Sequence, residues 1–281
     1  MAAVRKPAGP TSHDVVDLAR RALGTERVGH LGTLDPFAAG VLVLIVGRAT
    51  RLAPFAADWQ KEYEGVIRLG VTTSTDDATG RETGGSEGWR TLDRATVARA
   101  LAGFVGGYEQ RPPAFSAVKV GGERAYRRAR RGESVELASR RVEIRALELT
   151  EFALPDAGFR ATVGAGTYLR SLARDLGESL GCGAHLASLA RTRVGPYRLE
   201  EAIAPEALSA DALGDPAMLV RDLPRRELAA PERDAVAHGR PVAEAGKGQE
   251  GSVALFFGGT LIAVAEREGD LLKPRVVLTD A

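Results

Sequence analysis

The 281-residue chain is predicted to adopt an α+β fold, a mixed sheet with flanking helices, followed by a small β-rich C-terminal unit. Three observations support this fold class. Apolar runs typical of strands interleave with helical periods, but without a regular βαβ rhythm. From about residue 227 onward, short strand patterns are separated by tight turns. The content of 44% hydrophobic and 27% charged residues is that of a globular protein.

The first helix is expected to run to about Leu23, because Thr11 or Ser12 can cap its start and Gly24 can end it. The next elements, in chain order, are a buried strand at 41–46, a strand at 63–71, a polar glycine-rich loop or hairpin at 72–88, and a helix at 92–105.

The second half continues with strands at 142–152 and 159–163 and a helix at 167–180, with Arg170 near its start. The pattern changes around Leu223-Pro224. Short strands are expected after it at 253–257, 261–265 and 275–278, joined by turns at 258–259 and 268–269.

Several classes of protein are excluded by what the sequence lacks. No apolar run approaches the roughly 20 residues that span a bilayer, and no signal peptide is recognisable. Cys182 is the single cysteine, so we expect a packing residue and a reducing, cytoplasmic setting. The four histidines (His13, His30, His185, His238) form no metal-ligand pattern, so we expect no metal.

Positive charge is concentrated between Lys119 and Arg145, although the net charge of the whole chain is only +1. This segment holds nine Lys or Arg residues against four acids, and it has few apolar residues. Clustered arginines are typical of a phosphate-binding surface, and we expect such a segment to become ordered on its ligand. The alternative is a solvated helical face.

The most informative stretch is the glycine-rich segment 28–42, which places His30 and Asp35 five residues apart. Pro36 fixes the chain after Asp35, and a predicted core strand follows. An acid held in a rigid loop beside a core strand is suited to chemistry. On composition alone, the alternative is a simple Asp-Pro turn.

This stretch resembles the catalytic motif of the TruB-type bacterial tRNA pseudouridine synthases, and five further blocks match that family in the same order. The matching blocks are Gly29-His30-x-Gly32-Thr33-Leu34-Asp35-Pro36, Lys6-Pro7-x-Gly9-x-Thr11-Ser12, Lys61-x-Tyr63 with Leu69-Gly70, Gln110-x-Pro112-Pro113-x-Phe115-Ser116-Ala117-x-Lys119, Gly166-Thr167-Tyr168-Leu169-Arg170-Ser171, and Gly183-Ala184-His185-Leu186-x-x-Leu189-x-Arg191-Thr192. Together they cover most of residues 4–200.

The resemblance implies isomerisation of uridine 55 to pseudouridine in the T loop of tRNA, by cleavage and re-formation of the glycosidic bond on a flipped base. Asp35 is implied as the catalytic carboxylate, Arg170 as its ionic partner and Tyr63 as the ring that stacks on the target base. No cofactor is implied. Whether Asp35 attacks C1′, attacks C6 or takes a proton from C2′ stays open.

The resemblance also implies substrate contacts. Leu189 would close the pocket, and His30 would enter the RNA loop; without the motif, Leu189 would be expected in plain helix packing. Tyr168, Asp77 and Lys119 are further candidates, and Asp77 and Lys119 could equally brace the fold. We expect His185 to pack or cap.

Two domains are expected: a pseudouridine-synthase-like catalytic domain at 1–225, with a basic RNA-clamping insertion at about 113–141, and a PUA-like RNA-binding domain at 226–281. The implied partner is tRNA through its T stem-loop, with no membrane and no protein partner, and we expect a monomer.

The sequence departs from the family pattern at Ala165-Gly166, at Thr73-Ser74-Thr75 and at Leu31. These departures affect expected RNA contacts and leave Asp35, Tyr63 and Arg170 in place. Three other functions fit the sequence less well. A non-catalytic RNA-binding or RNA-folding protein would need no buried acid. A phosphoryl-transfer enzyme would need a Gly-x-x-x-x-Gly-Lys-Ser/Thr loop, which this sequence lacks. An acid-based glycosidase would need a second carboxylate where the motif supplies an arginine.

Overall fold

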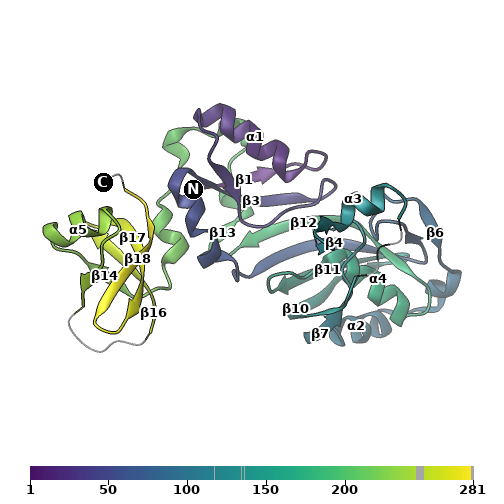
Figure 1. Cartoon of the computed structure of the whole chain (residues 1–281). Coiled ribbons are helices and arrows are strands. Elements are labelled where there is room, and N and C mark those ends of the chain that lie inside the picture. Colours follow the sequence, from purple (N-terminus) through teal and green to yellow (C-terminus); the bar gives the residue numbers. More distant parts are fainter. Residues whose placement is uncertain (117, 134, 136, 245–249, 280–281) are drawn as a thin grey trace.

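The computed structural model describes residues 1–116, 118–133, 135, 137–244 and 250–279, and these residues form two large sheets (Figure 1). The larger sheet follows the spatial order β1 (Ala2–Lys6), β3 (Ala39–Val46), β12 (Ala184–Val194), β4 (Lys61–Leu69), β11 (Asp156–Val163), β10 (Arg140–Ala153) and β7 (Gly106–Gln110). Two short strands extend it: β2 (Val28–His30) pairs with β3, and β13 (Tyr197–Arg198) pairs with β12.

Neighbouring strands of this sheet run antiparallel except β3 and β12, which run parallel where Ala39 and Gly40 meet Ala190 and Arg191. The prediction of a mixed sheet is therefore confirmed. The parallel contact joins the strand that follows the Asp35 loop to the strand that carries Leu189.

Helix α1 (Ser12–Leu23) begins and ends where the sequence predicts. The Thr11 side chain accepts from the Asp14 backbone N–H, the Asp14 carboxylate accepts from the Thr11 N–H, and Gly24 ends the helix in the left-handed conformation. Its apolar stripe packs on β1 and β3, in a cluster that includes Val15, Val16, Ala19, Val4, Leu42 and Leu44.

The helices α2 (Arg94–Ala102) and α4 (Leu169–Ser179) contribute to the main core of the sheet, and both lie within the predicted ranges. This core cluster includes Val97, Leu101, Leu172, Leu176, Ile67 and Phe159. Burial of these apolar side chains fixes the start of α4 against the sheet, which places Arg170.

The alternative of helix packing at Leu189 is excluded, because residues 184–194 form the strand β12. Its pairing with β4 shifts register between Leu186 and Ser188 and again between Arg191 and Arg193. Such bulges interrupt the period-two alternation that identifies a strand in a sequence.

Residues 72–91 contain the predicted hairpin, β5 (Thr72–Thr73) with β6 (Glu82–Gly84), and the 3₁₀ helix η2 (Glu87–Thr91). The basic segment contains only short elements, β8 (Lys119–Val120), β9 (Glu123–Arg124) and α3 (Ala125–Arg130). Ala117 of the matching block and Glu136 of the basic segment lie outside the described residues.

The C-terminal sheet has the order β14 (Arg225–Glu227), β16 (Gly251–Phe257), β17 (Thr260–Glu268), β18 (Leu271–Val277) and β15 (Val242–Ala243), with α5 (Ala230–Ala237) beside it (Figure 1). The predicted β-rich unit is thus confirmed, although its last strand starts four residues earlier than expected. The two sheets share a core cluster that includes Val43, Leu52, Phe256 and Val264. From the 3₁₀ helix η1 (Gly47–Ala56), Arg51 also donates to the carbonyls of Arg275 and Val277.

Within the described part of the chain, every helix is too short or too polar to cross a membrane.

Gly40→Ala is expected to lower the free energy of unfolding by about 3 kcal/mol or more, because it combines an unfavourable backbone conformation with a steric clash. Gly40 has φ +115°, and an added Cβ would lie 2.2 Å from the Arg191 carbonyl oxygen. Urea denaturation measures the loss.

Gly24→Ala is the matched control, since Gly24 also has positive φ (+62°) but no atom within 4 Å of an added Cβ. It should lose only about 1 kcal/mol. Equal losses in the two variants would contradict the close approach of β3 and β12 at Gly40.

Candidate active site

Asp35 lies in the loop between β2 and β3, and the backbone around it is fixed by local hydrogen bonds. The Ala38 N–H donates to the Asp35 carbonyl. The Ser12 hydroxyl bonds both the N–H (2.8 Å) and the carbonyl (2.9 Å) of Leu34. The loop is therefore tied to the first turn of α1. The Asp35 side chain remains 35% exposed, so its carboxylate can be reached from solvent.

Arg170, in the first turn of α4, holds the Asp35 carboxylate through two hydrogen bonds. Its Nε donates to Oδ2 at 2.9 Å and its Nη2 donates to Oδ1 at 3.1 Å. The same guanidinium donates to the carbonyls of Thr75 (3.0 Å) and Phe115 (2.9 Å). Because the Arg170 side chain is only 4% exposed, these acceptors replace the water that it loses on burial.

Asp77 is a second carboxylate beside the same arginine, with its Oδ2 3.7 Å from Arg170 Nε. The Asp77 side chain is 6% exposed. Its Oδ1 accepts from the Thr75 hydroxyl and from both the N–H and the hydroxyl of Thr79. The turn that carries Asp77 is thereby fixed, and one buried cation lies between two acids.

Tyr63 and Leu189 contribute to an apolar wall. Tyr63 lies in the centre of the sheet, on β4 opposite Ala161 and Arg191, and it is buried in the main core with Leu34. Leu189, on β12, is partly buried and packs against the same cluster. Leu34, the chain neighbour of Asp35, thus packs in the same cluster as an aromatic ring. A reachable carboxylate held by an arginine can act as a nucleophile or base on a flat ligand that such a ring holds.

The pair formed by Asp76 and Arg174 was not predicted from the sequence. Asp76 has φ +59°, unusual for a residue with a side chain, and its Oδ2 accepts from Arg174 Nη1 at 3.0 Å. Arg174 also pairs with Asp175 and donates to the Arg111 carbonyl. The sequence signal that could have identified Arg174 is its position four residues after Arg170, because this spacing puts both arginines on one face of α4.

Three of the predicted substrate-binding residues, Tyr168, Lys119 and His30, make no hydrogen bond or ion pair with Asp35 or Arg170 among the described residues. Tyr168 precedes α4, exchanges hydrogen bonds with the buried Gln110, and has the guanidinium of Arg140 5.1 Å from its ring centre. Lys119 is exposed on the β8–β9 hairpin.

His30 ends β2, and its Nδ1 is buried without a hydrogen-bond partner among the described residues. Burial is the main cause that lowers the pKa of His30, and the charge of Arg191 adds to it. A neutral His30 is the form that most easily leaves water. His185 is buried, as expected for packing, with Nδ1 2.8 Å from the Val71 carbonyl oxygen.

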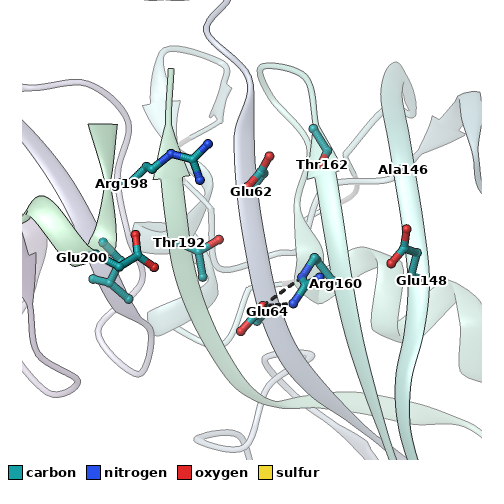
Figure 2. Close-up of a pocket in the computed structure, with 10 residues that line it drawn as sticks. Glu62, Glu64, Ala146, Glu148, Arg160, Thr162, Thr192, Arg198 and Glu200 are labelled. Atoms are coloured by element: carbon teal, nitrogen blue, oxygen red, sulfur yellow. Dashed lines mark hydrogen bonds and ion pairs between the residues drawn. The ribbon is translucent and has the colours of Figure 1, made fainter. Parts of the chain in front are cut away.

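A hollow of about 500 Å³ lies elsewhere, on the sheet face lined by Glu62, Glu64, Glu148 and Arg160 (Figure 2). Glu62 and Glu64 alternate with Tyr63 along β4 and therefore point to the opposite face. Arg160 bonds Glu64 there. None of the predicted site residues lines this hollow. In the described ranges, no three His, Cys, Asp or Glu side chains gather as a metal site.

Comparison with known sequences finds family models and relatives that are all named as pseudouridine synthases. Residues 20–169 match the family model described as TruB family pseudouridylate synthase (N terminal domain), and residues 170–220 match the tRNA pseudouridylate synthase B C-terminal domain. The tRNA pseudouridine synthase B of Thermobifida fusca (strain YX) is 47% identical, over 98% of this chain and 96% of its own length. That of Paenarthrobacter aurescens (strain TC1) is 41% identical, over 98% of this chain and 93% of its own.

Solved structures agree with the fold. A chain from the crystal structure of a Cbf5-Nop10-Gar1 complex has a TM-score of 0.73 at 27% identity and covers 99% of this chain and 84% of its own. A chain from the structure of an H/ACA RNP bound to a substrate RNA containing 2′-deoxyuridine has a TM-score of 0.72 at 25% identity, with the same coverage.

Arg174→Gln is expected to lower the free energy of unfolding by about 2 kcal/mol at pH 7, because it leaves two partly buried acids without their cation. Burial raises the pKa of Asp76 and of Asp175, and the charge of Arg174 opposes that rise. In the variant both pKa values rise further. Protonation then removes the unpaired charges, so the deficit shrinks as the pH falls from 7 towards 4.

Urea denaturation at a series of pH values checks this, with Arg68→Gln as the control. Arg68 pairs with Asp156 at the surface, where the side chains are 48% and 35% exposed, so the control should lose less than about 1 kcal/mol. A deficit of Arg174→Gln that grows on acidification would contradict the assigned pairing.

Proposed function

The chain belongs to the TruB family of pseudouridylate synthases, and from this premise we propose that it isomerises uridine 55 in the T loop of tRNA to pseudouridine. The observation that carries the proposal is the reachable Asp35 carboxylate held by the buried Arg170. The relatives named tRNA pseudouridine synthase B and the fold neighbour bound to a substrate RNA support the same substrate class.

The reaction breaks the N1–C1′ bond of the uridine, turns the uracil and rejoins it to the ribose through C5. C5 loses its proton and N1 gains one, so the product is an isomer of the substrate. It involves no redox change, so we expect no cofactor. It requires a group that acts on the ribose or the base while the free uracil is retained. Asp35 is that group, through attack at C1′, attack at C6 or removal of the C2′ proton.

Arg170 acts by orientation. Two hydrogen bonds fix the rotation of the carboxylate, and the carbonyls of Thr75 and Phe115 fix the guanidinium in turn. Asp77 limits the movement of Arg170 from the other side. Tyr63 stacks on the uracil and Leu189 closes the pocket, in keeping with their place in one apolar cluster.

The target uridine must leave its stack, because Asp35 cannot reach its ribose within a folded loop. His30 fills the space that the base leaves, and its desolvated ring with an unpartnered Nδ1 suits that insertion. Tyr168, Lys119 and the basic insertion at 113–141 contact the RNA backbone. The acids of the insertion reduce its charge, since Arg131 pairs with Glu123 and Glu133.

Residues 1–225 form the catalytic domain, and residues 226–281 form a PUA-like domain that contacts the RNA outside the T loop. The protein acts as a monomer on the T stem-loop, without a protein partner. It works in the cytoplasm, where its tRNA substrate is found.

Asp35→Asn is expected to abolish tritium release from a T stem-loop labelled at uridine C5, because the amide is a poor nucleophile and base. RNA affinity should stay within about tenfold, or 1.4 kcal/mol. Release and binding are measured without added metal or nucleotide.

Asp156→Asn is the matched control, since Asp156 pairs with Arg68 at the surface and should keep full turnover. Turnover by Asp35→Asn at the wild-type rate would contradict the role of Asp35. Tight binding without release by the wild type would instead favour an RNA-binding or RNA-folding protein.

RNA affinity is expected to fall as salt rises, because phosphate contacts release counterions. Arg127→Gln removes one charge of the basic insertion and should reduce the slope of log Kd against log salt by about 1, the value for one phosphate contact. Arg90→Gln removes an exposed charge in the η2 helix and should leave the slope unchanged. A flat salt response of the wild type would contradict phosphate-dominated binding.

A further inference from the structure

Two cations, Lys6 and Arg191, are completely buried on either side of the Asp35 loop. Both are 0% exposed, Lys6 at the end of β1 and Arg191 in the middle of β12. In the described part of the chain, neither has a carboxylate oxygen within 4.0 Å, whereas most of the other buried or half-buried arginines are ion-paired. A buried charge without a carboxylate partner is expensive, so its remaining partners indicate why it is kept.

All three side-chain nitrogens of Arg191 donate to backbone carbonyls of the segment that carries Asp35. Nε donates to Val41 (2.8 Å), Nη2 to Gly32 (3.0 Å) and Nη1 to Thr33 (3.4 Å). Gly32 and Thr33 precede Asp35, and Val41 follows it. One rigid guanidinium therefore joins the two ends of the loop and fixes the distance between them.

Lys6, at the end of β1, bonds to other carbonyls of the same loop and of the chain next to it. Its Nζ donates to the carbonyls of Ala38 (2.7 Å), Pro7 (2.9 Å) and Pro36 (3.3 Å). Burial, as the main cause, lowers the pKa of Lys6 to about 8; the charge of Arg191 acts in the same direction and that of Asp35 opposes it. The negative charge of Asp35 thus lies within the field of the buried Lys6 as well as beside Arg170.

We propose that Arg191 is a positioning residue for the reaction: its guanidinium clamps the ends of the Asp35 loop so that the carboxylate meets both Arg170 and the substrate. The inference rests on the proposed function, because it concerns the rate of the isomerisation. A displacement of about 1 Å in a reacting group can lower a rate about a hundredfold, so a clamp of this kind acts on turnover more than on binding.

Arg191→Lys is the decisive variant. It keeps the charge and the aliphatic stem, but one ammonium cannot span the carbonyls of Val41 and Gly32 as the planar fork does. We expect the single-turnover rate constant for tritium release to fall about ten- to hundredfold, while RNA Kd stays within about threefold. Arg191→Met, which also removes the charge, should be slower still, so that lysine gives partial rescue.

Arg193→Lys is the matched control, two residues along the same strand. Arg193 pairs with Glu62, and the two side chains are 27% and 28% exposed. In the described part of the chain, no side-chain hydrogen bond or ion pair joins Arg193 to the Asp35 loop. It should keep the wild-type rate. All rates are measured at least 10 °C below the thermal midpoint of each variant.

Hydrogen exchange of the free proteins gives a readout that does not depend on activity. For Arg191→Lys we expect faster exchange of the backbone amides confined to residues 31–39. A wild-type rate and unchanged exchange in Arg191→Lys would overturn the proposal. So would a joint loss of rate, affinity and protection along the whole of β3 and β12, which is the result for a purely structural role.

The wild type separates the two proposals. If it releases no tritium from the T stem-loop, the proposed function fails, and exchange at 31–39 still tests the clamp. If it is active and Arg191→Lys equals it, the clamp fails and the function stands.

Discussion

The guanidinium of Arg170 connects parts of the chain that are far apart in the sequence. Through it, the first turn of α4 contacts the Asp35 loop, the Thr75–Asp77 turn and the Phe115 carbonyl at the root of the basic segment. Each of these segments alone is a polar connection that could take many conformations. Because an arginine offers five donors in one plane, a single buried side chain fixes their relative positions.

The helix that carries Arg170 is in turn held by apolar packing. Leu172 and Leu176 are fully buried against the sheet, so α4 cannot rotate without opening the main core. The ion pair at the site therefore depends on hydrophobic burial that has no chemical role. The neighbouring pair of Arg174 and Asp76 adds a second brace, and it holds a turn whose backbone conformation costs free energy.

Local signals predicted much of the fold. The limits of α1 followed from Thr11 and Gly24, whose capping roles depend only on near neighbours. Strand β12 was missed because its bulges break the alternation, and a bulge is decided by the partner strand. The Asp35–Arg170 pair was expected only through the resemblance to a family, since no spacing rule links two residues that are 135 positions apart.

Contacts that depend on the folded backbone could not be predicted from the sequence. Arg191 and Lys6 stand in the matching blocks, but the sequence assigned neither a role, and only the structure shows that they are buried and bonded to carbonyls. The count of charges in the sequence likewise overstated the positive charge that the basic segment offers to a ligand. Arg128 and Arg131 both form ion pairs with Glu133, which neutralises part of that charge.

Arg170 and Asp35 are unequally exposed to solvent, and this difference affects the free energy of ligand binding. Arg170 has already lost its hydration on folding, whereas Asp35 keeps water on about a third of its surface. A planar base that covers Asp35 displaces that remaining water and lowers the local dielectric constant, so the Coulomb attraction between the two charges increases when the ligand arrives. The free energy of folding thus offsets the dehydration of the Arg170 guanidinium before any ligand binds. The binding free energy of the ligand has to offset only the remaining dehydration of the Asp35 carboxylate.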